Sequence, residues 1–185
     1  MTSTTGLSQL HYQLPLWTKD WRGAAAGTVV TALCAQVSFH LPFTPVPVTL
    51  QVFAVLLSGL LLGSRLGALS QLQYLVLGAL GAPVFADFNG GLMHLFGITG
   101  GYLLSYPFAA WISGLGKDCN LQRRMAVSLS ALALIYLMGC MQLSFFLPHA
   151  TLPATFIAGA GWFLVWDMVK LCAAVSLSRL FVRQL

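Results

Sequence analysis

Acidic residues are nearly absent from this chain, whose 185 residues include four aspartates and no glutamate. Charged residues of both signs make up 7% of the sequence and hydrophobic residues 58%, whereas soluble domains are about 25% charged. So few charges cannot cover a surface that faces water. The chain is therefore predicted to be an all-α integral membrane protein, because its apolar runs are continuous and lack the ten-residue alternation of a barrel.

Six apolar stretches predict six membrane-spanning helices, at residues 22–40, 48–63, 66–82, 98–116, 125–147 and 155–179. Prolines, glycines or charges separate the stretches, and they end helices through a lost backbone donor or lost rigidity. We expect a polar N-terminal leader over residues 1–21 and a single six-helix transmembrane domain over residues 22–185. The leader lacks a basic region followed by an apolar run, so it does not resemble a cleavable signal peptide.

The basic residues predict how these helices are oriented. One of the nine, Lys170, lies inside the last apolar stretch, and the first, third and fifth connections contain none. Because positive residues stay on the cytoplasmic side, both termini and the second and fourth connections are predicted to be cytoplasmic. This asymmetry accounts for the net charge of +5 without a nucleic-acid partner. The eight residues on the predicted cytoplasmic side are Lys19, Arg22, Arg65, Lys117, Arg123, Arg124, Arg179 and Arg183.

Asp167 and Lys170 place an acid and a base three residues apart in the last apolar stretch. On a helix such positions share a face, and each charge at the centre of a membrane helix costs about 2.5–3.5 kcal/mol. Two interpretations remain open: a pair that neutralises itself between packed helices, or a ligand or ion site. The neighbouring Phe163 and Trp166 favour a small-molecule pocket, because such pockets are mostly apolar with a few placed polar groups.

Other polar residues are candidates for the same cavity, although a helix-end or interhelical hydrogen bond explains each of them singly. They are Thr49, Gln51, Gln71, Gln73, Tyr74, Asp87, Asn89 and Tyr102. The four cysteines form no C-x-x-C pair and the four histidines are scattered, so neither a disulfide nor a metal site is expected.

Small residues recur at spacings of three and four along the first stretch, a pattern that lets helices approach closely in lipid. The pattern predicts either packing inside the bundle or a docking face for a partner membrane protein. The residues are Ala24, Gly27, Thr28, Thr31, Ala32 and Ala35. No glycine-rich phosphate loop precedes a lysine, so any ATP hydrolysis must come from a partner.

Several stretches resemble the BioY family, the biotin-binding membrane subunits (S components) of energy-coupling factor transporters. They run in the family's order between about residues 22 and 180. The stretches are LPFTPVPVTLQ (41–51), LLLGSRLGALSQLQYLVLGALGAPVFADFNGG (60–91), TGGYLL (99–104) and the D-x-x-K of Asp167 and Lys170.

The resemblance implies a six-helix S-component bundle in the bacterial cytoplasmic membrane, which captures biotin from the extracytoplasmic side. It implies no enzymatic activity and no cofactor, with biotin as the transported substrate. The expected partners are the lipid bilayer, a transmembrane coupling subunit docked by the first helix, and two ABC-type ATPases. The first and third connections would cover the pocket. The expected ligand-binding residues are Asp167, Lys170, Asn89, Asp87, Tyr102, Gln51, Phe43, Phe85 and Trp166.

The chain departs from the family pattern at two positions near the expected pocket. The family commonly has small residues where this chain has Asp87, and a proline where it has Ile98. A carboxylate beside the pocket mouth would repel an anionic substrate unless the carboxylate is paired or turned outward. The assignment of Asp87 to the ligand therefore depends on where its side chain points.

Three other functions are weighed against biotin binding. An intramembrane enzyme needs a nucleophile and base, or two aspartates, at membrane depth, but only Asp167 lies within a stretch and no G-x-S-x-G string occurs. An S component for a different vitamin would share the fold and differ in ligand. A purely structural membrane protein would not need the ordered family strings.

Overall fold

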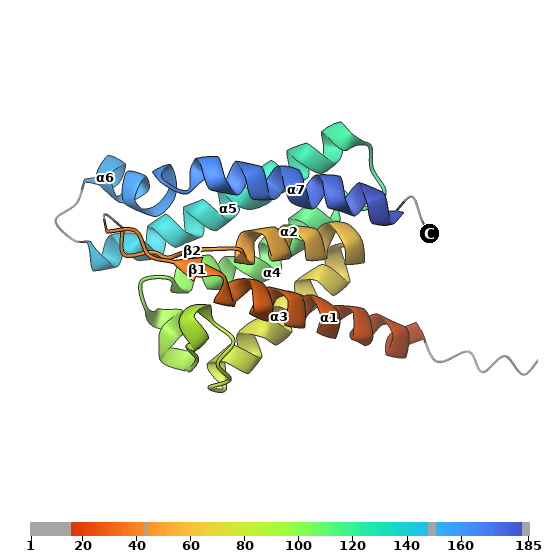
Figure 1. Cartoon of the computed structure of the whole chain (residues 1–185), viewed down its shortest axis with the longest axis horizontal. Coiled ribbons are helices and arrows are strands. Elements are labelled where there is room, and N and C mark those ends of the chain that lie inside the picture. The colour runs from red at the N-terminus through yellow and green to blue at the C-terminus, as the bar shows by residue number, and fades with distance from the viewer. Residues whose placement is uncertain (1–15, 43, 148–150, 183–185) are drawn as a thin grey trace, which may run out of the picture.

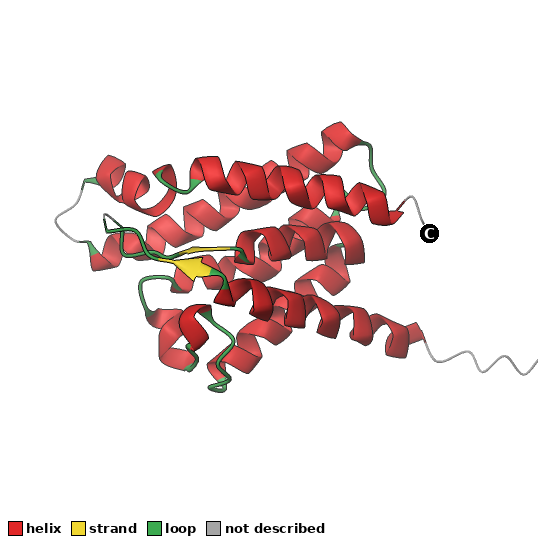
Figure 2. Ribbon diagram, in the orientation of Figure 1, coloured by secondary structure: helices red, strands yellow, loops and turns green. Residues whose placement is uncertain are grey.

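Helices make up most of residues 16–42, 44–147 and 151–182, the part of the chain that this computed structural model describes (Figure 2). The α-helices are α1 (Leu16–Gln36), α2 (Gln51–Leu62), α3 (Ser64–Ala79), α4 (Gly100–Gly114), α5 (Leu121–Phe146), α6 (Leu152–Phe156) and α7 (Leu164–Val182). Two 3-10 helices, η1 (Ala86–Phe88) and η2 (Leu92–Phe96), lie between α3 and α4, and a π-helix, η3 (Ile157–Gly161), follows α6. Strands β1 (Ser38–Phe39) and β2 (Val48–Thr49) form an antiparallel hairpin between α1 and α2, with Ser38 opposite Thr49.

The helices run alternately between two ends of the molecule (Figure 1). The start of α1, the α2–α3 turn, the α4–α5 connection and the end of α7 meet at one end, which we call the basic end. The β-hairpin, η1, η2 and α6 meet at the opposite end, the loop end. The predicted clustering of basic residues is confirmed for those whose side chains the structure describes, which are Arg22, Arg65, Lys117, Arg123, Arg124 and Arg179.

The six predicted stretches are present as helical passes, but the α2, α3 and α4 passes are shorter than a membrane span. By length and hydropathy, α5 alone among the described helices could cross a membrane, and α6 with α7 counts as a second when taken as one bent span. Helices α2 and α4 contain 12 and 15 residues, and at about 1.5 Å per residue neither reaches the bilayer's hydrocarbon thickness of about 30 Å. The structure also begins α1 at Leu16, so the end of the predicted leader is helical.

The last pass is broken, where the sequence predicted one helix over residues 155–179. Its two parts, Pro153–Gly161 and Leu164–Phe181, are bent by 42°. The π-helix at the break leaves carbonyl oxygens to accept other hydrogen bonds. The Thr44 hydroxyl donates to the Ala158 carbonyl at 2.7 Å and the Tyr102 hydroxyl to the Gly159 carbonyl at 2.8 Å. Side chains remote in sequence therefore stabilise the break.

The small residues of α1 lie inside the bundle, against α3. The Thr28 hydroxyl donates to the Ser70 carbonyl at 2.7 Å, and the Gln71 amide donates to the Thr31 hydroxyl at 3.0 Å. A Cβ added at Gly27 would lie 2.9 Å from the Ser70 Cβ. This corrects the docking-face interpretation in favour of internal packing. Five of the six residues are buried and Ala32 packs against the core: Ala24, Gly27, Thr28, Thr31, Ala32 and Ala35.

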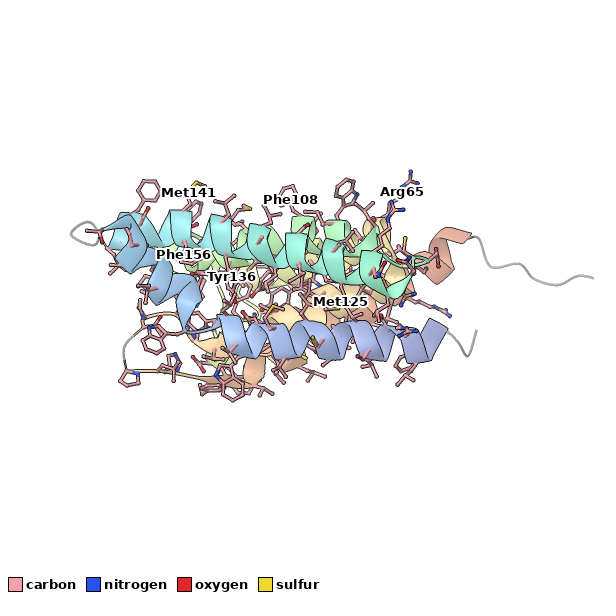
Figure 3. All side chains as sticks on the ribbon, turned by 90° about the horizontal axis from the view of Figure 1, so that it is seen from above. Arg65, Phe108, Met125, Tyr136, Met141 and Phe156 are labelled. Atoms are coloured by element: carbon pink, nitrogen blue, oxygen red, sulfur yellow. The ribbon has the colours of Figure 1, made fainter. Side chains whose placement is uncertain are left out.

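The outer surface of the bundle is apolar. Phe108 and Met141 point away from the helices in Figure 3, and they are 58% and 60% exposed. Leu72 on α3, Leu137 on α5 and Val165 on α7 are also at least half exposed. Soluble proteins rarely expose so many large apolar side chains together. The surface of this bundle matches a lipid environment, as the composition predicts.

Helix α2 is the central element, because it packs against α1, α3, α4 and α7. Nine of its twelve residues are buried, so the helix is enclosed on nearly every side. Its close contact with α4 requires glycine, since a Cβ at Gly59 would lie 2.4 Å from the Ala110 carbonyl oxygen. The α2–α3 turn requires glycine at Gly63, where φ is +86°.

Gly59→Ala is expected to lower the free energy of unfolding by about 1–3 kcal/mol, because the added methyl overpacks the α2–α4 contact. Gly97→Ala is the matched control, since its Cβ would meet the His94 carbonyl oxygen at an ordinary 3.4 Å. Denaturant unfolding in detergent micelles measures both variants. Equal stabilities would contradict the close approach of α2 and α4.

Candidate functional site

A cavity of about 500 Å³ opens near the loop end, between the first and third connections and the helices beneath them. Its walls come from α2, α4, α5, η3 and α7, and its mouth from the segments around His40 and Asn89. Small-molecule sites have volumes of about 300–1,000 Å³, mostly apolar walls and a few polar groups. The cavity therefore has the size for one small organic ligand.

The Asp167 carboxylate is the most buried charge on the cavity wall, with 4% of its side chain exposed. Its Oδ1 lies 2.6 Å from the Lys170 Nζ, and its Oδ2 accepts a hydrogen bond from the Tyr136 hydroxyl at 2.6 Å. Figure 3 shows Tyr136 between α5 and α7. The Lys170 side chain is 10% exposed and lines the cavity. Since an ammonium has three donors, it can bind Asp167 and a ligand at once.

A second set of polar side chains surrounds Gln51, at the start of α2. Its amide donates to the Tyr74 hydroxyl at 2.5 Å, and its Oε1 accepts from the hydroxyls of Thr49 at 3.0 Å and Tyr106 at 3.3 Å. These contacts fix the side chain with its polar atoms already bonded. Gln51 therefore shapes the cavity wall through its neighbours.

Phe85 fixes the third connection against α3. Its ring is 1% exposed, meets Tyr74 edge-on at 5.5 Å between centroids and stacks on His94 at 5.7 Å. A Cβ at Gly78 would lie 2.1 Å from this ring, so only glycine fits beneath it. Nearby, the Asn89 amide donates to the Ala86 carbonyl at 3.0 Å and closes a turn at the cavity mouth.

The structure brings most of the predicted ligand set to one cavity. Trp166 is the exception among the described residues, because it is 55% exposed and lies outside the cavity. The adjacent Asp167 faces inward and contacts Tyr136, whereas Trp166 faces outward, so the expectation for Trp166 is corrected. Phe43 lies outside the described residues. The residues that line the cavity are Asp167, Lys170, Asn89, Asp87, Tyr102, Gln51 and Phe85.

Sequence reasoning missed two tyrosines and a threonine. Tyr106 stands four residues after Tyr102, so the two share a face of α4 and both line the cavity. Tyr136 interrupts an apolar run, where a hydroxyl needs a buried partner, and that signal could have marked it. Thr44 could not be found from local pattern, because its acceptor, Ala158, lies 114 residues away.

Comparisons with known proteins identify related sequences along nearly the whole chain. A model of the BioY family matches residues 3–185. A "Probable biotin transporter BioY" from Pyrococcus horikoshii is 46% identical over 81% of this chain and 88% of that protein. A "Biotin transporter BioY" from Thermotoga maritima is 36% identical over 83% and 90%. A "Probable biotin transporter BioY" from Bacillus subtilis is 35% identical over 80% and 82%. These relatives are named as transporters, not as enzymes.

One solved structure shares the fold. It is the crystal structure of the S-component for biotin from an ECF-type ABC transporter. The two chains agree with a TM-score of 0.83 at 24% identity, over 90% of this chain and 92% of the other. The family resemblance drawn from the motifs is confirmed by these matches.

Lys170→Met is expected to lower the free energy of unfolding, without ligand, because Asp167 is left as a buried charge without its cation. Loss of one partner of a buried pair costs about 3–5 kcal/mol in soluble proteins. The double variant Asp167→Asn with Lys170→Met should recover most of the loss, since no lone charge remains. Unfolding in micelles measures both.

Lys117→Met at the basic end is the matched control, because Lys117 Nζ only reaches the Leu62 carbonyl at 3.5 Å. A double variant as unstable as Lys170→Met would show that the pair is not a mutually neutralising unit.

Proposed function

The chain belongs to the BioY family, and on that basis we propose that it binds biotin in the cavity at the loop end and serves as the substrate-binding subunit for biotin uptake. One observation carries the proposal: the buried Asp167–Lys170 pair faces a cavity of ligand size. Such a pair is neutral while the cavity is empty and supplies charge-assisted hydrogen bonds when a ligand enters.

The groups around the cavity match the chemistry of biotin. The ureido ring has two N–H donors and a carbonyl acceptor, which a carboxylate and an ammonium complement. Tyr136 holds the Asp167 carboxylate in place through Oδ2. Lys170 donates to the ureido carbonyl or attracts the valerate carboxylate. The aromatic rings of Phe85, Tyr102 and Phe163 provide walls for the thioether ring and the valerate chain.

The basic end faces the cytoplasm and the loop end faces outward in this proposal. The support is the segregation of positive residues to the basic end and the exposed apolar side chains between the two ends. Both termini are then cytoplasmic, because α1 begins and α7 ends at the basic end. Biotin enters the cavity from the outside.

Transport energy comes from partner subunits in this proposal, a transmembrane coupling subunit and two ATPases. The support is twofold. The neighbour of known structure is a component of an ECF-type ABC transporter, and the sequence contains no phosphate-binding loop of its own. The small-residue face of α1 is buried against α3, so in this proposal a partner meets outer surfaces of the bundle.

Biotin is expected to raise the melting temperature of the purified protein, because a ligand that binds only the folded state stabilises it by mass action. Riboflavin and thiamine should have no effect. The Asp167→Asn, Lys170→Met double variant should fold but bind biotin at least about 100-fold more weakly, since two charge-assisted hydrogen bonds are lost. Calorimetric titration with biotin measures the affinity.

Asp118→Asn is the control, because it removes an exposed carboxylate at the opposite end from the cavity. Normal biotin affinity in the double variant would assign the pair a structural role only. A response to another vitamin in place of biotin would leave the cavity as the site and change the ligand.

Cysteine labelling tests the orientation. In a variant without the four native cysteines, Asn89→Cys should react with a membrane-impermeant maleimide from outside intact cells, and Asn120→Cys should react only after permeabilisation. Both positions are exposed, one at each end of the bundle. The reverse pattern would invert the proposed topology.

A further inference from the structure

Asp87 joins the two connections that form the cavity mouth. Its Oδ1 accepts a hydrogen bond from the Ser38 hydroxyl at 2.5 Å, and its Oδ2 lies 3.3 Å from the His40 Nε2. Ser38 belongs to β1 and His40 follows it, whereas Asp87 lies in η1, more than forty residues along the chain. Both carboxylate oxygens therefore contact the opposite connection.

The backbone at Asp87 is strained. Asp87 and Phe88 have φ values of +59° and +56°, and neither is glycine. Residues with side chains adopt this left-handed region only when surrounding contacts hold them there. Here the Gln36 Oε1 accepts the Phe88 N–H at 2.9 Å, and Asp87 is held by Ser38 and His40. Losing the Asp87 contacts would let this turn relax away from the hairpin.

Two other attachments, made by Gln36 and Thr44, are partly buried, whereas the hydrogen bond between Asp87 and Ser38 is exposed. The Gln36 amide also donates to the Phe85 carbonyl at 3.1 Å, at the inner edge of the third connection. Thr44 ties the first connection to η3 through Ala158. Asp87 supplies the outer attachment, with His40 beside it on the cavity lining.

We propose that Asp87 is a positioning residue that latches the first and third connections together over the cavity and so sets the rates at which ligand enters and leaves. The identity of the ligand rests on the proposed function. The contacts that join the two connections rest on the structure alone. Asp87 then has no direct contact with the ligand. The pairing of its carboxylate with the opposite connection also reduces its repulsion of an anionic substrate.

The latch is first tested without ligand, by hydrogen–deuterium exchange of residues 84–91 and 37–49. Asp87→Ala should speed exchange in both segments by roughly tenfold, the equivalent of one hydrogen bond to a charged group. Asp118→Ala, which removes an exposed aspartate at the basic end, should leave exchange unchanged. Ser38→Ala combined with Asp87→Ala should add little to Asp87→Ala alone, because the two residues share one interaction. Unchanged exchange, or full additivity, would overturn the latch.

Stopped-flow binding of biotin tests the effect on ligand exchange. Asp87→Ala should raise the association and dissociation rate constants together, by up to about tenfold, with a dissociation constant within roughly threefold of wild type. A slower association would overturn the proposal. Faster dissociation at an unchanged association rate would also overturn it, because that pattern indicates a residue that contacts the ligand. Asp87→Asn keeps the shape of the side chain and removes its charge, so it should raise both rate constants by an intermediate amount. It replaces Asp87→Ala in the test if that variant does not fold.

The two experiments separate the latch from the proposed function. If the wild-type protein does not bind biotin, the proposed function fails, and hydrogen exchange still decides whether Asp87 latches the mouth. If biotin binds and exchange is unaffected by Asp87→Ala, the latch fails and the binding site remains.

Discussion

The ion pair between Asp167 and Lys170 constrains the loop-end half of this structure. Two opposite charges buried at 4% and 10% exposure must stay together, because either one alone would be costly in a bundle surrounded by lipid. The Tyr136 hydroxyl adds a third group and ties α7 to α5 through the same carboxylate. The result is a fixed polar group on a mostly apolar cavity wall, and such groups orient small ligands.

The break in the last pass connects this fixed point to the cavity mouth. The bend of 42° lies just before α7, a few residues from Asp167. The carbonyls of η3 accept from Tyr102 on the wall and from Thr44 in the first connection. Asp87 contacts Ser38 and His40 in that same connection, so side-chain contacts join the first connection both to η3 and to the third connection. The mouth and the binding groups therefore belong to one connected arrangement.

Local pattern was sufficient for some features and insufficient for others. Hydropathy located the six helical passes, and charge located the basic end, because both depend on single-residue chemistry. The break at η3 was not predictable, because its stabilising partners lie far away in sequence. The α1 stripe fitted two interpretations, and only its contacts with Ser70 and Gln71 show that it packs inside. Trp166 was assigned to the wrong face, since the inward face of α7 depends on contacts with other helices, such as that of Asp167 with Tyr136.

The Asp167–Lys170 pair is proposed as a ligand-binding element within the loop-end cavity. A structure of the protein determined with biotin bound tests it most directly. We expect the ureido ring inside the cavity, with at least one of its polar atoms within about 3 Å of the Asp167 carboxylate or the Lys170 ammonium. Biotin bound elsewhere, or in the cavity without contact to either residue, would contradict it.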